Sequence, residues 1–387
     1  MSRQRKPQVI GLSTLILFMS LEYRKSLVES REKLHGFREI VENFPPYLDE
    51  IRARVAALKI YPIKTLSAFP DMNFSVGKDG LTSEGGFKDR MAMIVQRKPG
   101  KCDEGAFDYV RFSQRTAPQF SQIYTAATTD STMDYEAPDF ETFTLNVSDL
   151  APKGGETVVT RIFDNGELAA GVLENGPVTE WIRRFLSKFP GRGTLDLNDV
   201  HVVVQTSDFE RKVEELHRRG IDSRILYSDG GQILVTSQST LDWLNDGLQR
   251  EYGDHREILM NAFRPNIVLD KVPACASSVN ELPANIEDLI DTAEFKPGHL
   301  NESAQKEVDG VRMKFGKMCT RCAVPNIDPK TAKVTAEPGK WLIGNRPRRP
   351  DTPKATFGVN AEFKVGEEKN VIADGDSFII TGEKTSL

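Results

Sequence analysis

Short apolar runs separated by clusters of Gly, Pro and Asp dominate the chain from about residue 55 onward. Runs of this length that are rich in β-branched and aromatic residues are typical of β-strands. In the first half of the chain they predict strands at residues 58–63, 91–95, 123–127, 143–147 and 158–162. Many short strands with turn signals between them favour a barrel or a sandwich.

Helical spacing of apolar residues occurs at three places. An apolar face between residues 181 and 186 predicts a helix that closes the first half of the chain. Residues 209–219 predict a charged amphipathic helix, preceded by Asp208 as its N-cap and stopped by Gly220. Residues 240–248 predict a third helix.

The second half carries fewer strand signals and one long polar stretch. Strands are predicted at residues 200–204, 233–235, 311–315 and 378–381. A loop or insertion is predicted at residues 271–301, which are polar and interrupted by prolines. Glycines and a proline between residues 188 and 194 mark a junction, so the pattern predicts one domain over 55–190 and a second over 200–385.

Residues 1–54 differ in character from the rest of the chain. Glu, Lys, Arg and Leu are frequent from about residue 22 to 57 and predict a helical segment interrupted at Pro45-Pro46. An apolar run at residues 9–21 follows three basic residues; as a helix it would span about 20 Å, against roughly 30 Å for a bilayer core. Two interpretations stay open: a targeting or membrane-attachment segment, and a buried docking helix.

The charge balance narrows the classes of partner. The 387 residues include 51 Lys and Arg against 56 Asp and Glu, for a formal net charge of -5. That balance argues against nucleic acid as a partner and still allows a local basic pocket for a small anion. Four cysteines exclude a disulfide scaffold and suit a reducing compartment. The sequence also lacks a phosphate-binding loop, a GxSxG elbow and paired histidines at helical spacing, so the commonest enzyme motifs are absent.

The most informative segment is residues 319–322, with the sequence Cys-Thr-Arg-Cys. Two cysteines at this spacing can bind zinc, form a redox pair, present one thiolate to another metal, or be buried and inert. Zinc is disfavoured because Cys102, Cys275 and the histidines are distant in the sequence, and prolines downstream disfavour a thioredoxin-type helix. A guanidinium favours the thiolate form of a neighbouring cysteine and can hold a phosphate, so Arg321 suits a metal cofactor that carries phosphate.

Residues 319–329, CTRCAVPNIDP, resemble the CxRCxxPxxDP signature of MOSC domains, which occur in molybdenum-cofactor sulfurases and in amidoxime-reducing molybdoenzymes. Further segments resemble motifs of this family in the same order along the chain. They are Tyr61-Pro62-Ile63-Lys64-Thr65, Gly80-Leu81 with Asp89-Arg90, Gln114-Arg115 with Pro118, Tyr227-Ser228-Asp229-Gly230, Ser237 through Leu241 to Asn245, Phe263-Arg264-Pro265-Asn266-Ile267-Val268, Pro338 with Leu342 and Arg346, Phe357-Gly358, and Gly375-Asp376. The resemblance therefore runs from about residue 55 to 381.

The resemblance implies a mixed α/β, β-rich fold, with an N-terminal β-barrel domain followed by a MOSC-type β-barrel domain with flanking helices. In the amidoxime reductases, the second cysteine of the motif binds molybdenum beside the dithiolene sulfurs of a pterin, and this position is Cys322 here. Motif positions that contact the molybdenum–molybdopterin cofactor correspond to Lys64, Thr65, Arg90, Ser237, Arg264, Asn266, Thr320 and Arg321. The cationic members of this set suit a phosphate.

The resemblance also implies a function. It is the reduction of small N-hydroxylated, amidoxime-like substrates, with electrons from an external donor such as cytochrome b5 and its reductase. The implied location is the mitochondrial outer membrane facing the cytosol, or the cytoplasm. Two alternatives stay open: a module that holds or delivers molybdopterin without turnover, and a relative that binds no metal. We expect no pyridoxal-phosphate-dependent sulfurase domain in the roughly 50 residues before the first motif.

The sequence departs from the amidoxime reductases at three places. The acidic-x-x-Trp segment that follows their FRPNI motif is absent, and the polar stretch from Lys271 takes its place. The glycine of their DPxTG motif is Ala332, and the tyrosine that often follows their FG pair is Asn360. These departures fall at positions around the substrate or around the electron partner, so they bear on the substrate range and the electron donor. The motif positions that contact the cofactor are unchanged.

Overall fold

The computed structural model describes residues 52–71, 73–99, 107–162, 168–189, 196–206, 211, 224–271, 292–296, 311–346, 354–364, 370–374 and 376–380. All of them belong to one compact unit, Asp49–Leu387. The apolar run predicted at residues 9–21 and the helix predicted from residue 22 lie outside the described residues as far as residue 51. Within the described part of the chain, no helix has the length and apolar character needed to cross a membrane.

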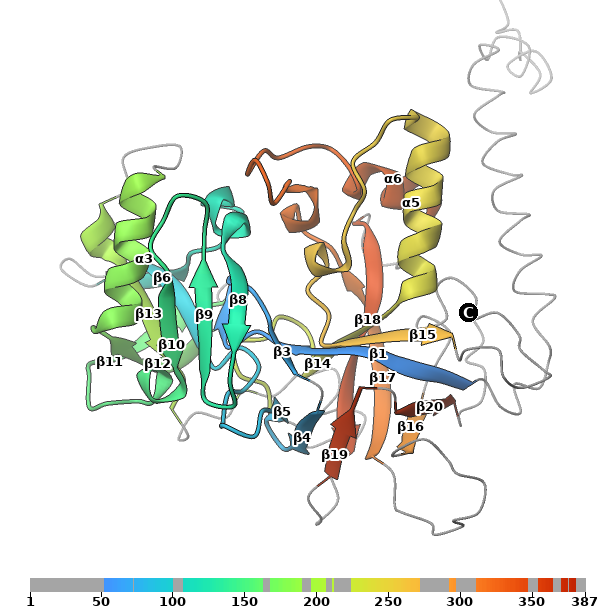
Figure 1. Cartoon of the computed structure of the whole chain (residues 1–387). Coiled ribbons are helices and arrows are strands. Elements are labelled where there is room, and N and C mark those ends of the chain that lie inside the picture. The colour runs from blue at the N-terminus through green and yellow to red at the C-terminus, as the bar shows by residue number, and fades with distance from the viewer. Residues whose placement is uncertain are drawn as a thin grey trace, which may run out of the picture. The chain divides into compact units, whose positions relative to one another are not determined.

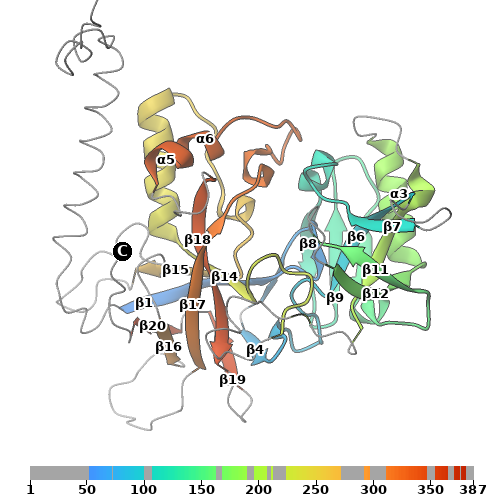
Figure 2. The ribbon, with the colours of Figure 1, turned by 180° about the vertical axis from the view of Figure 1, so that it is seen from behind.

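Five strands close into the barrel predicted for the N-terminal half (Figures 1 and 2). They are β6 (Ala92–Pro99), β7 (Phe107–Arg111), β11 (Thr157–Arg161), β12 (Leu168–Glu174) and β13 (Val200–Val204). The antiparallel pairing of β13 with β6 completes the ring, and the short β2 (Ile63–Lys64) pairs with β6 in parallel. Met93, Val95 and Val203 pack in its core with Tyr227, because alternate residues of a barrel strand point inward.

A small sheet and a helix pack together through aromatic side chains in the N-terminal half. The sheet contains β8 (Tyr124–Thr128), β9 (Thr132–Glu136) and β10 (Phe143–Asn146). The helix is α3 (Pro177–Lys188), where the sequence predicts one, and Trp181 is almost fully buried on its apolar face. The Trp181 ring lies 5.4 Å from that of Phe143 and 6.2 Å from that of Tyr135.

The C-terminal half is built on an eight-stranded sheet, seven strands of which form a second closed ring. The ring follows the order β15 (Ile267–Lys271), β14 (Ile233–Ser237), β18 (Thr356–Lys364), β17 (Val311–Thr320), β16 (Thr292–Lys296), β20 (Ser377–Ile380) and β1 (Arg52–Ile60), with β3 (Phe69–Asp71) attached to β1. The pairing of β1 with β15 closes it, and the two strands run side by side in Figure 1. A strand from the start of the described chain therefore completes the sheet of its C-terminal half.

A third sheet and two helices complete the fold. β19 (Asn370–Ala373) pairs with β4 (Asn73–Gly77), which pairs with β5 (Gly80–Thr82). Helices α5 (Gln238–Tyr252) and α6 (Gly339–Asn345) pack together, and a Cβ on Gly247 would meet the Trp341 ring at 1.9 Å, so only glycine fits this contact. Short 3-10 turns are η2 (Pro118–Gln122), η3 (Val147–Leu150), η4 (Leu197–Asp199), η5 (Met260–Ala262) and η7 (Val324–Asn326).

Four expectations from the sequence are corrected by the structure. The helix predicted up to residue 57 is wrong from residue 52, because these residues form β1. The strand at residues 200–204, predicted to open the second domain, is β13 of the first barrel. The predicted loop at 271–301 contains β16. Of the helix predicted at 209–219, the structure describes only Arg211, which forms a β-bridge with Ile225 and is therefore not helical.

Candidate functional site

A cavity of about 1440 Å³ is lined by residues of both halves of the chain. Its described lining carries an excess of positive charge, since Asp229 is its single carboxylate residue. The cationic side chains that line it are Lys64, Arg90, Arg111, Arg115, Arg211, Arg264, Arg321, Lys340 and Lys354. A concave site with this imbalance suits an anionic ligand, although the chain as a whole is slightly acidic.

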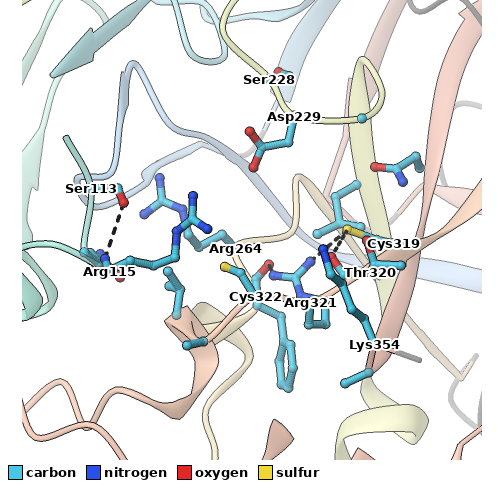
Figure 3. A pocket seen from close by; sticks show the side chains of 18 of the residues that line it. Ser113, Arg115, Ser228, Asp229, Arg264, Cys319, Thr320, Arg321, Cys322 and Lys354 are labelled. Carbon is cyan, nitrogen blue, oxygen red and sulfur yellow. Dashed lines mark hydrogen bonds between the residues drawn. The ribbon is translucent and has the colours of Figure 1, made fainter. Parts of the chain in front are cut away.

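The Cys-Thr-Arg-Cys segment forms one wall of the cavity. Strand β17 ends at Thr320, and the turn that follows exposes the Cys322 side chain, whereas Cys319 is half-buried. Arg321 is fixed by three contacts: its Nη1 donates to Cys319 Sγ (3.0 Å), its Nη2 to the Phe263 carbonyl (2.6 Å) and its backbone N–H to the Ala355 carbonyl (2.7 Å). Figure 3 shows the Cys322 thiol in the open cavity and Cys319 beside Arg321.

The cysteine pair does not form a zinc site in the described structure. No group of three or more His, Cys, Asp and Glu side chains that could hold a metal ion occurs among the described residues. A tetrahedral zinc site needs about four such ligands. Of the alternatives left open by the sequence, a single thiolate for a metal that arrives with its own ligands fits the exposed Cys322 best.

Two arginines stack against the buried ring of Tyr61. The guanidinium carbons of Arg264 and Arg90 lie 4.3 Å and 4.6 Å from its centroid, within the range of cation–π contacts. Arg90 also pairs with Asp89, which is almost fully buried. Burial, and then the charge of Arg90, lower the pKa of Arg264 to about 10, so its guanidinium still carries its charge at neutral pH. The two guanidinium groups therefore lie at one position, where the Asp89 carboxylate offsets the charge of Arg90 and Arg264 adds a further positive charge.

Backbone strain coincides with these residues. Thr65, Arg90 and Arg264 have φ angles of 101°, 49° and 57°, in the region that side chains other than glycine rarely adopt. Each such residue costs about 1–3 kcal/mol and persists only where its surroundings hold it. Here Arg90 N–H donates to the Tyr61 carbonyl (2.8 Å), and Arg264 Nη1 donates to the Leu66 carbonyl (2.7 Å). Strain concentrated in one cavity indicates a functional site.

Among the described residues that line the cavity, two buried guanidinium nitrogens still lack a hydrogen-bond partner. They are Nη2 of Arg264 and Nε of Arg321, both belonging to side chains that line the cavity. Most buried polar groups in proteins are hydrogen-bonded, and charged donors left unpaired are costly. Phosphate oxygens are the acceptors that charged donors of this kind prefer, so the arginines that line the cavity fit an anionic cofactor.

The carboxylate of Asp229 is fixed by two cations. Lys64 Nζ donates to its Oδ1 at 2.5 Å and Arg111 Nη1 to the same atom at 3.3 Å. Arg211 holds the surrounding loop, because its Nη1 donates to the carbonyls of Leu226 (3.0 Å) and Ser228 (2.6 Å). Sequence reasoning missed Arg111, Arg211 and Asp229 as site residues. Only Asp229 carried a signal, since it lies within one of the matched motifs.

Comparison with known families agrees with this architecture. A family model described as the MOSC N-terminal beta barrel domain matches residues 52–188, and one described as the MOSC domain matches residues 222–378. The chain is a MOSC-domain protein. The two matches together cover about three quarters of the chain, and MOSC domains are associated with binding of the molybdenum cofactor. No curated protein matches the chain.

Eight of the nine residues predicted for the cofactor site of this MOSC protein line the cavity. They are Lys64, Thr65, Arg90, Arg264, Asn266, Thr320, Arg321 and Cys322. The side-chain amide of Asn266, one of these eight, also forms hydrogen bonds within the protein. Its Nδ2 donates to the Lys59 carbonyl (3.0 Å), while its Oδ1 accepts from Leu234 N–H (3.0 Å) and from Arg90 Nη1 (3.1 Å). Asn266 therefore positions Arg90.

Ser237, the ninth residue, does not line the cavity. It is fully buried at the N-cap of α5, where its hydroxyl accepts a hydrogen bond from the Thr240 N–H. In this MOSC protein the conformation of Ser237 suits a helix cap and not a cofactor contact.

Replacement of Ser237 by alanine tests this assignment. We expect Ser237→Ala to lower the free energy of unfolding by about 1 kcal/mol, the usual cost of losing an N-cap. Cofactor content should be unchanged, because the hydroxyl is directed at the α5 backbone. Urea unfolding and cofactor analysis of the same preparation measure both quantities. Loss of cofactor from a stably folded Ser237→Ala protein would show instead that Ser237 contributes to cofactor binding.

Proposed function

We propose that this MOSC protein binds a molybdenum–molybdopterin cofactor in the cavity and reduces N-hydroxylated, amidoxime-like compounds with electrons from an external donor. The observation that carries the proposal is an exposed thiol in a cavity where cations far outnumber carboxylates and two buried guanidinium nitrogens lack a partner. A cofactor that combines a phosphate with a metal that binds thiolate uses both features.

The residues have distinct roles in this proposal. Arg264 and Arg321 would hold the phosphate through their guanidinium groups, with Arg90 adding charge beside Arg264. Thr65 and Thr320 line the same cavity and offer hydroxyl groups. Cys322 would supply a thiolate to molybdenum, since its side chain is exposed to the cavity. Cys319 would not bind molybdenum, because its sulfur accepts a hydrogen bond from Arg321.

The reaction needs electrons that the amino-acid side chains do not supply. When bound, a molybdenum centre supplies two-electron oxygen-atom chemistry. The net reaction takes an N-hydroxylated compound, two electrons and two protons to the reduced N–H compound and water. By the family resemblance, the donor would be cytochrome b5 with its reductase. The protein's own contribution is to hold the cofactor with Cys322 facing an open part of the cavity that a small substrate can enter.

Metal analysis of the full chain tests the proposal. Protein purified from a host that makes molybdopterin should contain stoichiometric molybdenum and pterin, and protein from a host that lacks the pathway should contain neither. The loaded protein should reduce a model amidoxime with a chemical or cytochrome donor, whereas a cofactor carrier would hold molybdenum without turnover. Absence of molybdenum from protein of the competent host would contradict the proposal.

A further inference from the structure

Asp229 is the one carboxylate in the described lining of a strongly cationic cavity, and it is presented to the cavity. Its side chain is 60% exposed, whereas those of its partners Lys64 and Arg111 are 9% and 10% exposed. Figure 3 shows the carboxylate projecting from its loop into the cavity. Both cations contact Oδ1, and Oδ2 has no hydrogen-bond partner among the described residues.

The loop that carries Asp229 is held rigidly. Lys64 Nζ donates to the Tyr227 carbonyl (2.6 Å), and Arg211 binds carbonyls on either side of Tyr227. Ser228 donates its hydroxyl to Asp89 (3.4 Å). Partial removal from bulk water inside the cavity raises the pKa of Asp229, but the charge and hydrogen bond of Lys64 together with the charges of Arg90 and Arg211 outweigh that effect, so the pKa is lowered and the carboxylate is ionised at neutral pH. Oδ2 is therefore a fixed, charged acceptor with an open lone pair.

We infer that Asp229 Oδ2 accepts a hydrogen bond from the neutral N–C–N edge of a ligand, a planar group in which a carbon joins an amino group to a second nitrogen. The surrounding cations exclude a ligand that is itself positively charged, because like charges in one cavity repel. A neutral N–H group escapes that repulsion and still gains a charge-assisted bond. The identity of the ligand rests on the proposed function.

Two molecules of the proposed reaction carry such an edge. One is the amino-pyrimidinone ring of the pterin, and the other is the amidoxime substrate, which is neutral at neutral pH. The two sources share the chemistry that Asp229 recognises. The two differ in what a substitution of Asp229 would change. If Asp229 binds the pterin, the substitution weakens retention of the cofactor; if Asp229 binds the amidoxime, it weakens binding of the substrate.

The test uses purified cofactor-free protein and three probes: pterin, benzamidoxime and inorganic phosphate. We expect Asp229→Asn to weaken binding of pterin, benzamidoxime or both by about 10- to 100-fold, the usual effect of losing a hydrogen bond to a charged group. Phosphate should bind as tightly or more tightly, because a negative charge has left the cavity. Asp246→Asn, which removes an exposed charge on α5, is the matched control and should change none of the three affinities.

The outcomes separate the sources and the alternatives. Weaker pterin binding alone assigns Asp229 to the cofactor, and weaker benzamidoxime binding alone assigns it to the substrate. Unchanged binding of both neutral probes overturns the inference, even if the wild-type protein holds molybdenum and the proposed function stands. Binding of neither probe to the wild-type protein also overturns it. Dependence of pterin binding on Asp229 in a protein that never acquires molybdenum would support the inference and refute the proposed function.

A second measurement needs no variant, in case Asp229→Asn does not fold. Lumazine resembles pterin but has a carbonyl where pterin has its amino group, so it places an acceptor opposite Oδ2. Wild-type protein should bind pterin about 10- to 100-fold more tightly than lumazine if the edge faces Asp229. Equal affinity for the two, together with equal affinity for benzamidoxime and its N-methylated analogue, overturns the inference.

Discussion

Replacement of Cys322 by alanine is expected to abolish amidoxime reduction while leaving the protein folded. The side chain is exposed in the cavity, so its loss leaves no buried void and should cost little stability. If Cys322 supplies the thiolate to molybdenum, its loss should lower turnover at least about 100-fold, because even the outer partners of metal ligands are worth 10- to 100-fold. Steady-state reduction of a model amidoxime, normalised to pterin content, measures the effect.

The neighbouring cysteine provides the matched control. Cys319 is three residues away and half-buried, and its sulfur accepts a hydrogen bond from Arg321 at 3.0 Å. Cys319→Ala should retain measurable turnover and molybdenum, with a moderate loss because Arg321 loses one of its anchors. Full activity of Cys322→Ala, or equal loss in the two variants, would contradict the assignment of Cys322 as the metal ligand.

Most of the candidate site could be predicted because its residues lie in short motifs. Lys64, Arg90, Arg264 and Cys322 are far apart in the sequence, yet the structure places all of them around one cavity. Motif positions carry this information even when the pairing that joins them cannot be derived from local pattern. The roles of buried polar residues are harder to predict: Ser237, expected to contact the cofactor, caps α5, and Asn266 bonds to neighbouring backbone beside the cavity. A buried amide or hydroxyl serves the backbone in many folds, and only the hydrogen-bond partners distinguish the two uses.

The parts that could not be predicted depend on contacts between distant segments. Arg111 ends strand β7 and Arg211 lies alone in a bridge with Ile225, and neither position has a distinctive neighbour in sequence. Residues 52–57 of strand β1 were assigned to a helix because the segment that ends there is rich in Glu, Lys, Arg and Leu, whereas a strand was predicted from residue 58. Pairing with β15 and β20 overrides that local preference. Closure of both rings is set by such pairings, which apolar periodicity does not reveal.

Asn266 joins three segments of the fold beside the cavity. Its side chain accepts hydrogen bonds from the backbone of β14 at Leu234 and from Arg90, and it donates to the backbone of β1 at Lys59. The residue is 1% exposed, so no water can replace these partners without rearrangement. Loss of the amide would leave a buried N–H and a buried carbonyl unpaired, and each such group costs about 1–3 kcal/mol.

Asn266→Ala is therefore expected to lower the free energy of unfolding by about 2–5 kcal/mol and to reduce cofactor content, because Arg90 loses the group that fixes it. Asn245→Ala is the matched control. The Asn245 side chain also joins two segments, since its Nδ2 donates to the Ile258 carbonyl and its Oδ1 accepts from the Ile258 N–H, both at 2.9 Å. Asn245 does not line the cavity. Urea unfolding should show both variants destabilised, while molybdenum and pterin analysis of folded protein should show loss only for Asn266→Ala. Equal cofactor content in the two would mean that Arg90 does not depend on Asn266 and that the amide serves stability alone.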